Sequence, residues 1–197
     1  MIRTTILFAA LSVGPALAQD APTGDPAAAK EMLRETFGWR CTEAMDGRFA
    51  DEEPDIFTID VRADYEDAPL ETFTLYRLSC GAGAYNLIDL WLVAAPDGPP
   101  EPAAFPVPLA EPVYADEASE VLERIDVTGF TAEPTLVNSS YDPETRTITS
   151  YSKWRGIGDA YESGTWRFDY GRFVLTDYEV DPTFDGEQTP VTVFPTD

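Results

Sequence analysis

The sequence predicts a mostly β protein built of antiparallel meanders, with one short N-terminal helix. Three observations support this prediction. Apolar residues tend to alternate with polar ones from Ile56 onward, turn-forming clusters recur about every ten residues in the second half, and only residues 26–37 place apolar side chains at helical spacing. A sandwich and propeller-like blades both fit these patterns, because periodicity does not specify how sheets pack.

The first 18 residues have the pattern of a cleaved export signal. Arg3 precedes an apolar run over residues 4–13, and an Ala-Leu-Ala cleavage box ends at Ala18. This run is shorter than the roughly 20 apolar residues that a membrane-spanning helix needs. We therefore expect a mature chain that starts near Gln19, is periplasmic or secreted, and has no membrane contact after cleavage. A retained membrane anchor is the alternative.

The mature chain, residues 19–197, is expected to form a single β-rich domain. Two meander halves, about 35–130 and 131–197, are an alternative subdivision of that domain. The reason is that a stretch rich in proline, glycine and acidic residues separates two runs of predicted strands.

One helix is predicted over residues 26–37, before the strands. Asp25 can cap its first turn, and Pro26 suits the first helical position. The apolar residues Ala29, Met32, Leu33 and Phe37 follow at helical spacing. Gly38 is expected to end the helix.

The strands predicted near residues 72–80 and 85–93 have apolar residues on both faces, which is typical of central, buried strands. Between them and the second half, residues 95–108 are rich in proline and are expected to form a surface loop. Residues 117–127 are compatible with a strand or with a short helix.

Four β-rich runs follow in the second half, at residues 135–140, 146–154, 160–170 and 172–180. Asp142 and Pro143 predict a turn between the first two runs. Gly171 is expected to take a positive φ in a tight hairpin between the last two.

The glycine-rich segment that begins at Arg155 is best interpreted as a turn. A phosphate loop would lead into a helix and carry a lysine, and neither follows here. An EF-hand calcium loop is a poor fit, although Asp181, Asp185 and Glu187 match its spacing loosely. Solvated charge is the alternative interpretation of those carboxylates.

The charge of the chain limits its partners. Asp and Glu number 36 against 13 Lys and Arg, and the formal net charge is −23. Nucleic acid and anionic membranes are therefore excluded as partners. A basic periplasmic protein is compatible with this charge, although no particular partner can be assigned.

The chain contains no histidine. This excludes Ser-His and Cys-His nucleophilic catalysis and nearly all zinc and copper sites. We therefore expect a protein that is not an enzyme, with no catalytic residue, no cofactor and no metal site.

The two cysteines, Cys41 and Cys80, predict a disulfide, because an even pair in an oxidising compartment is ordinarily bridged. Two free buried thiols are the alternative. The four tryptophans could stack on sugars, but tryptophan is also common in buried sheet faces, and the core interpretation is favoured.

Two segments, residues 80–86 and 141–175, resemble the signatures of the domain of unknown function 1176 family of exported bacterial proteins. Four turn residues match the second signature: Arg155, Gly156, Gly158 and Asp159. Ala160 and Phe184 stand where the family pattern has cysteines, so a disulfide implied for relatives is missing here. The resemblance implies a periplasmic, β-rich protein and no activity.

These observations favour a non-enzymatic binding or interaction protein. One alternative is an inhibitor of a basic cell-wall-degrading enzyme such as lysozyme, because an acidic protein would be steered toward it. A second alternative is a carboxylate-dependent carbohydrate-active or sugar-binding protein, which rests on acidic and aromatic content alone.

Overall fold

The computed structural model describes residues 24–118 and 121–195, so the predicted export signal lies outside the described residues. The helical elements are α1 (Pro26–Met32), the π-helix η1 (Leu33–Phe37) and α2 (Thr42–Met45). The strands are β1 (Asp55–Arg62), β2 (Leu70–Ala82), β3 (Leu87–Ala94), β4 (Pro100–Pro102), β5 (Phe105–Tyr114), β6 (Leu122–Glu133), β7 (Thr135–Val137), β8 (Ser140–Asp142), β9 (Thr147–Lys153), β10 (Tyr161–Asp169), β11 (Arg172–Asp181) and β12 (Val191–Phe194). The mostly β prediction is confirmed.

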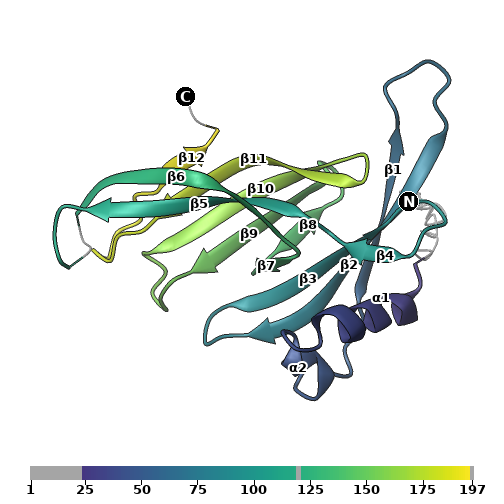
Figure 1. Cartoon of the computed structure of the whole chain (residues 1–197), viewed down its shortest axis with the longest axis horizontal. Helices are drawn as coiled ribbons and strands as arrows, with labels where there is room; N and C mark the ends of the chain where they lie inside the picture. Colours follow the sequence, from purple (N-terminus) through teal and green to yellow (C-terminus); the bar gives the residue numbers. More distant parts are fainter. Residues whose placement is uncertain (1–23, 119–120, 196–197) are drawn as a thin grey trace, which may run out of the picture.

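The strands form three antiparallel sheets (Figure 1). The first sheet has the order β1-β2-β3-β4, and β7 also pairs with β3. The second sheet is a meander with the order β12-β11-β10-β9-β8. The third is a two-stranded ribbon of β5 and β6, in which β5 contacts β11 and β12.

The predicted helix forms at the expected place. The Asp25 carboxylate accepts a hydrogen bond from the Ala27 backbone at 2.9 Å, and the buried face consists of Ala29, Leu33 and Phe37. The segment lies against one face of the first sheet (Figure 1). α2 was not predicted. None of the helices in the described ranges is long and apolar enough to cross a bilayer.

Both faces of β2 and β3 are buried, as predicted for central strands. Tyr76 and Leu92 pack with the helical segment on one face. Leu75 and Trp91 point the other way and pack with residues of the second sheet. The first sheet is therefore the middle layer between the helices and the second meander.

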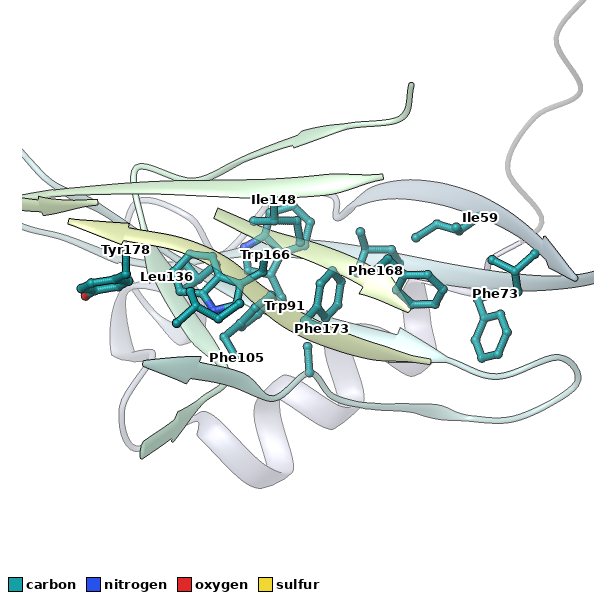
Figure 2. Packing of buried hydrophobic residues seen from close by; sticks show 14 of the residues in the cluster. Ile59, Phe73, Trp91, Phe105, Leu136, Ile148, Trp166, Phe168, Phe173 and Tyr178 are labelled. Carbon is teal, nitrogen blue, oxygen red and sulfur yellow. The ribbon is translucent and has the colours of Figure 1, made fainter. Parts of the chain in front are cut away.

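The larger core cluster draws on all three sheets. Figure 2 shows its side chains in a row that runs from Tyr178 to Ile59 and Phe73. Phe105, at the start of β5, lies with its ring centroid 5.5 Å from that of Trp166 and 4.6 Å from that of Phe173. The ribbon thus contributes a buried aromatic residue to the core that joins the sheets.

The prediction of a surface loop over residues 95–108 is wrong in part, because it includes β4 and the start of β5. Pro106 and Pro108 are two residues apart, so their nitrogens lie on the same edge of β5. In a two-stranded ribbon, each strand has one edge with no partner strand. Backbone N–H groups on that edge make no ladder hydrogen bond, so proline is tolerated there. For residues 117–127, the strand alternative is correct from Leu122 onward.

The predicted turns and the predicted disulfide are confirmed. Asp142 Oδ1 accepts a hydrogen bond from the Glu144 backbone at 2.8 Å, and Gly171 has a φ of 84°. Cys41 and Cys80 are joined by a bond of 2.02 Å between their sulfur atoms. This bond ties the chain after η1 to the end of β2.

Candidate functional site

The four matching turn residues form a compact turn between β9 and β10. Arg155 Nε donates to Asp159 Oδ1 at 2.6 Å, and its Nη2 donates to Oδ2. Gly158 takes a φ of 74°, which favours glycine, and its backbone nitrogen donates to the Arg155 carbonyl at 3.0 Å. Asp159 is 3% exposed, and the Arg155 guanidinium holds the pKa of its carboxyl well below the usual range. This ion pair fixes the shape of the turn.

The same turn holds the segment between β11 and β12. The Gly186 backbone donates to Asp159 Oδ2 at 3.0 Å, and Gln188 Nε2 donates to the Gly158 carbonyl at 2.7 Å. The Arg155 guanidinium lies 5.2 Å from the centre of the Phe184 ring. These contacts are noncovalent, in a region where the family resemblance implies a disulfide in relatives.

Of the three carboxylates considered for calcium, Asp181 ends β11, and Asp185 and Glu187 lie in that segment. Asp181 accepts hydrogen bonds from the backbone and hydroxyl of Thr183 and from the Thr189 backbone. Asp185 accepts one from the Glu187 backbone at 2.9 Å. Within the described residues, no group of three or more His, Cys, Asp or Glu could hold a metal ion. Asp181 and Asp185 therefore shape local turns.

The two family signatures, which are distant in sequence, meet in the fold. Tyr85 Oη donates to the Trp154 carbonyl at 3.0 Å, and its ring lies over Gly156. Asn86 Nδ2 donates to the Lys153 carbonyl at 2.8 Å, while Asn86 Oδ1 accepts from the Lys153 backbone at 3.2 Å. We call the contact between residues 83–87 and residues 153–158 the signature junction.

Asn138, in the connection between β7 and β8, completes the signature junction. Its Nδ2 donates to Asn86 Oδ1 at 3.0 Å and to the Tyr151 carbonyl at 2.9 Å. Its Oδ1 accepts from the Leu87 backbone at 2.9 Å, and its own φ is 44°. Sequence analysis did not identify this residue, although an asparagine between two strands is a recognisable turn signal.

The signature junction leaves apolar side chains exposed. Tyr85 is 41% exposed, Leu87 51% and Ile157 72%. Exposed aliphatic and aromatic residues that gather at one place are typical of a contact surface. Neither Leu87 nor Ile157 was singled out from the sequence.

A cleft of about 430 Å³ borders the junction and shares Leu87 and Asn138 with it. Its charged lining consists of four carboxylates and one guanidinium, from Glu52, Glu53, Asp55, Asp89 and Arg77. Arg77 donates to Asp55 through Nε at 3.0 Å and through Nη2 at 2.5 Å. The cleft is therefore acidic.

Asp89 is the most buried of these carboxylates, at 7% exposure. Its Oδ2 accepts from the Ser139 hydroxyl at 2.6 Å and from the Ser139 backbone at 3.2 Å. Burial raises the pKa of Asp89, and the Ser139 hydrogen bond and the Arg77 charge oppose that rise. A single Asp within the apolar run of β3 is the sequence signal that could have identified this residue.

The Ser139 hydroxyl is held from both sides. It donates to Asp89 and accepts from Trp91 Nε1 at 2.9 Å. The Ser139 hydroxyl therefore uses its proton on Asp89 and its oxygen on Trp91. Both bonds hold the connection after β7 in place.

The tryptophans do not form a sugar platform in the cleft. Trp91 and Trp166 are 0% and 1% exposed, as the core interpretation predicts, whereas Trp39 is 78% exposed and does not belong to the core. Trp154, within the junction, is half-buried. No aromatic ring is among the described residues that line the cleft.

The fold and the signature junction define a disulfide-bonded, antiparallel β protein with an acidic cleft. The chain belongs to the family described as a protein of unknown function (DUF1176), whose sequence profile matches residues 9–196. This confirms the resemblance that the two signatures indicate.

Among curated proteins, the chain is similar to the uncharacterized protein YpfG of Escherichia coli strain K12, with 35% identity over 118 residues. The match covers 59% of this chain and 29% of YpfG, so it spans less than a third of that relative's length. No solved structure matches this chain.

Proposed function

We propose that this chain is a non-enzymatic binding protein of the periplasm that contacts a protein partner through the signature junction. The observation that carries the proposal is that two distant signatures are hydrogen-bonded together while Leu87 and Ile157 stay exposed. Such a junction is held by several hydrogen bonds, and it presents apolar surface beside an acidic cleft. Both properties suit recognition of a partner.

A basic partner is favoured by charge. The chain carries a formal charge of −23, and the cleft beside the junction has four carboxylates around one guanidinium. Such a field would steer a basic protein toward this face and repel an acidic one. The export pattern of residues 1–18 supports a meeting in the periplasm.

The proposal is tested by capture on the immobilised protein at two salt concentrations. Wild type is compared with the double variant Leu87→Ser and Ile157→Ser, and with a matched control, Val174→Ser and Val191→Ser. The control residues are each 39% exposed and lie in the second sheet. We expect a periplasmic protein to be retained at about 0.15 M salt, where surface charges are screened beyond roughly 8 Å.

Retention by wild type and by the control, together with loss in the junction variant, would support the proposal. Equal retention by all three proteins would place the contact elsewhere. Complete release of every protein at the higher salt would mean that the acidic surface acts as a nonspecific exchanger, which would contradict the proposal.

A second candidate function is inhibition of a basic wall-degrading enzyme such as lysozyme. An acidic cleft beside exposed apolar residues favours it, because both could engage the active-site face of a basic enzyme. Lysozyme turnover is measured with excess protein at moderate salt. Undiminished turnover would exclude this function and leave the more general binding proposal standing.

A further inference from the structure

The hairpin of β1 and β2 extends past the rest of the first sheet (Figure 1). β3 pairs with β2 only as far as Thr74, which lies opposite Ala94. Residues 70–73 of β2 therefore pair with β1 on one side and, among the described residues, with no strand on the other. This leaves an open strand edge at the projecting end of the sheet.

The two faces of this projecting hairpin differ. Phe73 turns one face into the larger core cluster. On the opposite face, Leu70 is 53% exposed, and the exposed Thr72 donates its hydroxyl to Asp60 at 2.6 Å. The helical segment packs on this same face from Tyr76 onward. Within the described ranges, the face is therefore covered at one end and open at the other.

A groove of about 690 Å³ lies beside the open part of this face. One wall consists of β2 from Leu70 to Tyr76, and the other is the turn between β3 and β4, residues 95–99. Asp25 and Ala28 close the end at α1. Sites that bury small ligands have volumes of about 300–1,000 Å³, so the groove can take a short extended peptide.

The described chain begins on this sheet face. A Cβ on Gly24 would lie 2.8 Å from a methyl carbon of Ile56 and 2.9 Å from that of Thr74. The backbone nitrogen of the next residue, Asp25, donates to Tyr76 Oη at 3.2 Å. The first described residues are therefore held against the sheet at the mouth of the groove.

The order of contacts along β2 gives the direction of the chain. Cys41 is bonded to Cys80 near the end of β2, whereas Asp25 contacts Tyr76 in the middle of the strand. Going back along the chain thus moves toward the start of β2. The position that continues this order is the end of the groove at Leu70.

The length of chain ahead of Gly24 matches the groove. The predicted cleavage after Ala18 leaves residues 19–23, and five extended residues span at most about 17 Å. Residues 70–74 of β2 cover about 13 Å. Pro22 favours an extended backbone in the residue before it. Because the segment is tethered, its local concentration at the groove is on the order of millimolar.

We propose that the mature N-terminal segment, residues 19–23, docks in this groove as an extended strap along the open face of β2. The inference rests on the predicted cleavage site and is independent of the proposed function. The open edge of β2 offers backbone donors and acceptors to the strap. Removal of the export signal would then complete the cover of the first sheet.

The test is an NMR study of the purified exported protein, whose mass should correspond to residues 19–197. We expect order parameters above about 0.6 for the backbone amides of Ala21 and Thr23. We also expect nuclear Overhauser contacts from Ala21 to the methyl groups of Leu70 or Thr72. An order parameter below about 0.6, or the absence of these contacts, would overturn the proposal, as would a mature chain that does not start at Gln19.

A second copy of the chain is the competing occupant of the groove. In that case the amide shifts of Leu70 and Thr72 would depend on protein concentration, and the contacts from Ala21 would be absent. This result would also overturn the proposal.

Two threonine variants separate the groove from other exposed strand surface. Thr72 lies in the groove and Thr128 lies in β6, and both are exposed with a hydroxyl that donates to a carboxylate. Thr72→Arg fills the groove, so it should lower the order parameters of Ala21 and Thr23 below about 0.6. Thr128→Arg should leave them unchanged, and equal values in the two variants would overturn the proposal. The wild-type contacts decide the proposal even if Thr72→Arg does not fold.

Discussion

The buried carboxylates of Asp89 and Asp159 differ in how their charge is balanced. Asp159 receives both arms of the Arg155 guanidinium, so the folded state stabilises its anion and its pKa is lowered. Asp89 receives only a hydroxyl and a backbone donor, and burial raises its pKa. The charge of Asp159 is therefore balanced by a cation, whereas Asp89 is held by neutral donors.

Asp159→Asn should destabilise the fold at neutral pH, because the bidentate ion pair becomes a weaker neutral contact. The pKa of Asp159 is lower in the folded protein, so its contribution is present above the unfolded pKa of about 3.9 and is lost as pH falls through the folded pKa. The difference in melting temperature between wild type and variant should therefore be largest near pH 6 and shrink toward pH 2.

Asp185→Asn is the matched control, because Asp185 is exposed and accepts one local backbone hydrogen bond. Its melting temperature should stay close to that of wild type across the same pH range. A gap between wild type and Asp159→Asn that does not narrow in acid would refute the electrostatic explanation.

At the scale of single elements, Gly164 in β10 lies so close to the Trp166 ring that a larger residue does not fit without a shift. A Cβ on Gly164 would lie 2.5 Å from the Trp166 indole and 2.7 Å from the Tyr178 ring. Trp166 is 1% exposed, so a shift of its ring would disturb the packing around it. Gly164→Ala should therefore lower the free energy of unfolding by about 1–3 kcal/mol.

Gly129→Ala in β6 provides the comparison. The nearest atom to its added Cβ would be a Leu109 methyl carbon at 3.9 Å, which is an ordinary contact. Its effect in urea unfolding should stay within about 0.5 kcal/mol. Equal losses of unfolding free energy in the two variants would contradict the explanation by a clash with the indole, because only Gly164 lies against that ring.

The disulfide links the helical segment to a central strand. It closes a loop with a sequence separation of 39 residues. Replacing Cys41 and Cys80 together by alanine should cost about 4 kcal/mol in the free energy of unfolding, because the unfolded chain gains freedom. Urea unfolding of wild type in reductant should show a similar loss, and a loss below about 1 kcal/mol would contradict the chain-entropy explanation.

The elements that could be predicted are those whose signals are local. Asp25 and Pro26 are adjacent signals for a helix start, and Gly171 marks its own hairpin. The strand at Phe105 could not be predicted, because its prolines are tolerated only on an edge that needs no donor. Whether a strand has such an edge depends on its partner, β6, and therefore on the whole fold.

At the scale of the molecule, Asn138 fastens the first sheet to the second. Its side chain bonds to Leu87 at the start of β3 and to Tyr151 in β9. Asn138→Ala removes these contacts and the one to Asn86, and it places alanine at a φ of 44°, so it should lower the free energy of unfolding by about 1–3 kcal/mol.

Asn138→Gly separates the two causes, because glycine tolerates this φ but offers no side chain. It should lose less stability than the alanine variant and still fall below wild type in thermal melts. A glycine variant as stable as wild type would mean that the side-chain bonds between the sheets contribute nothing.

The candidate site shows what sequence alone could predict at this scale. The turn from Arg155 to Asp159 was identified from its glycines and its family match. The acidic cleft was not identified, because its residues come from the segment before β1, from β1, β2 and β3, and from the connection after β7. With 36 acidic residues in the chain, only the fold determines which of them share a cleft.

The placement of the indole rings gives the molecule its own optical reporters. Trp39 is 78% exposed and should be quenched readily by acrylamide, whereas Trp91 and Trp166 lie in the core and should be shielded. Trp91 is also hydrogen-bonded to the serine that binds Asp89. With Trp39 and Trp154 replaced by phenylalanine, a shift in emission wavelength would report events near the serine that binds Asp89 from inside the folded protein, without any attached dye.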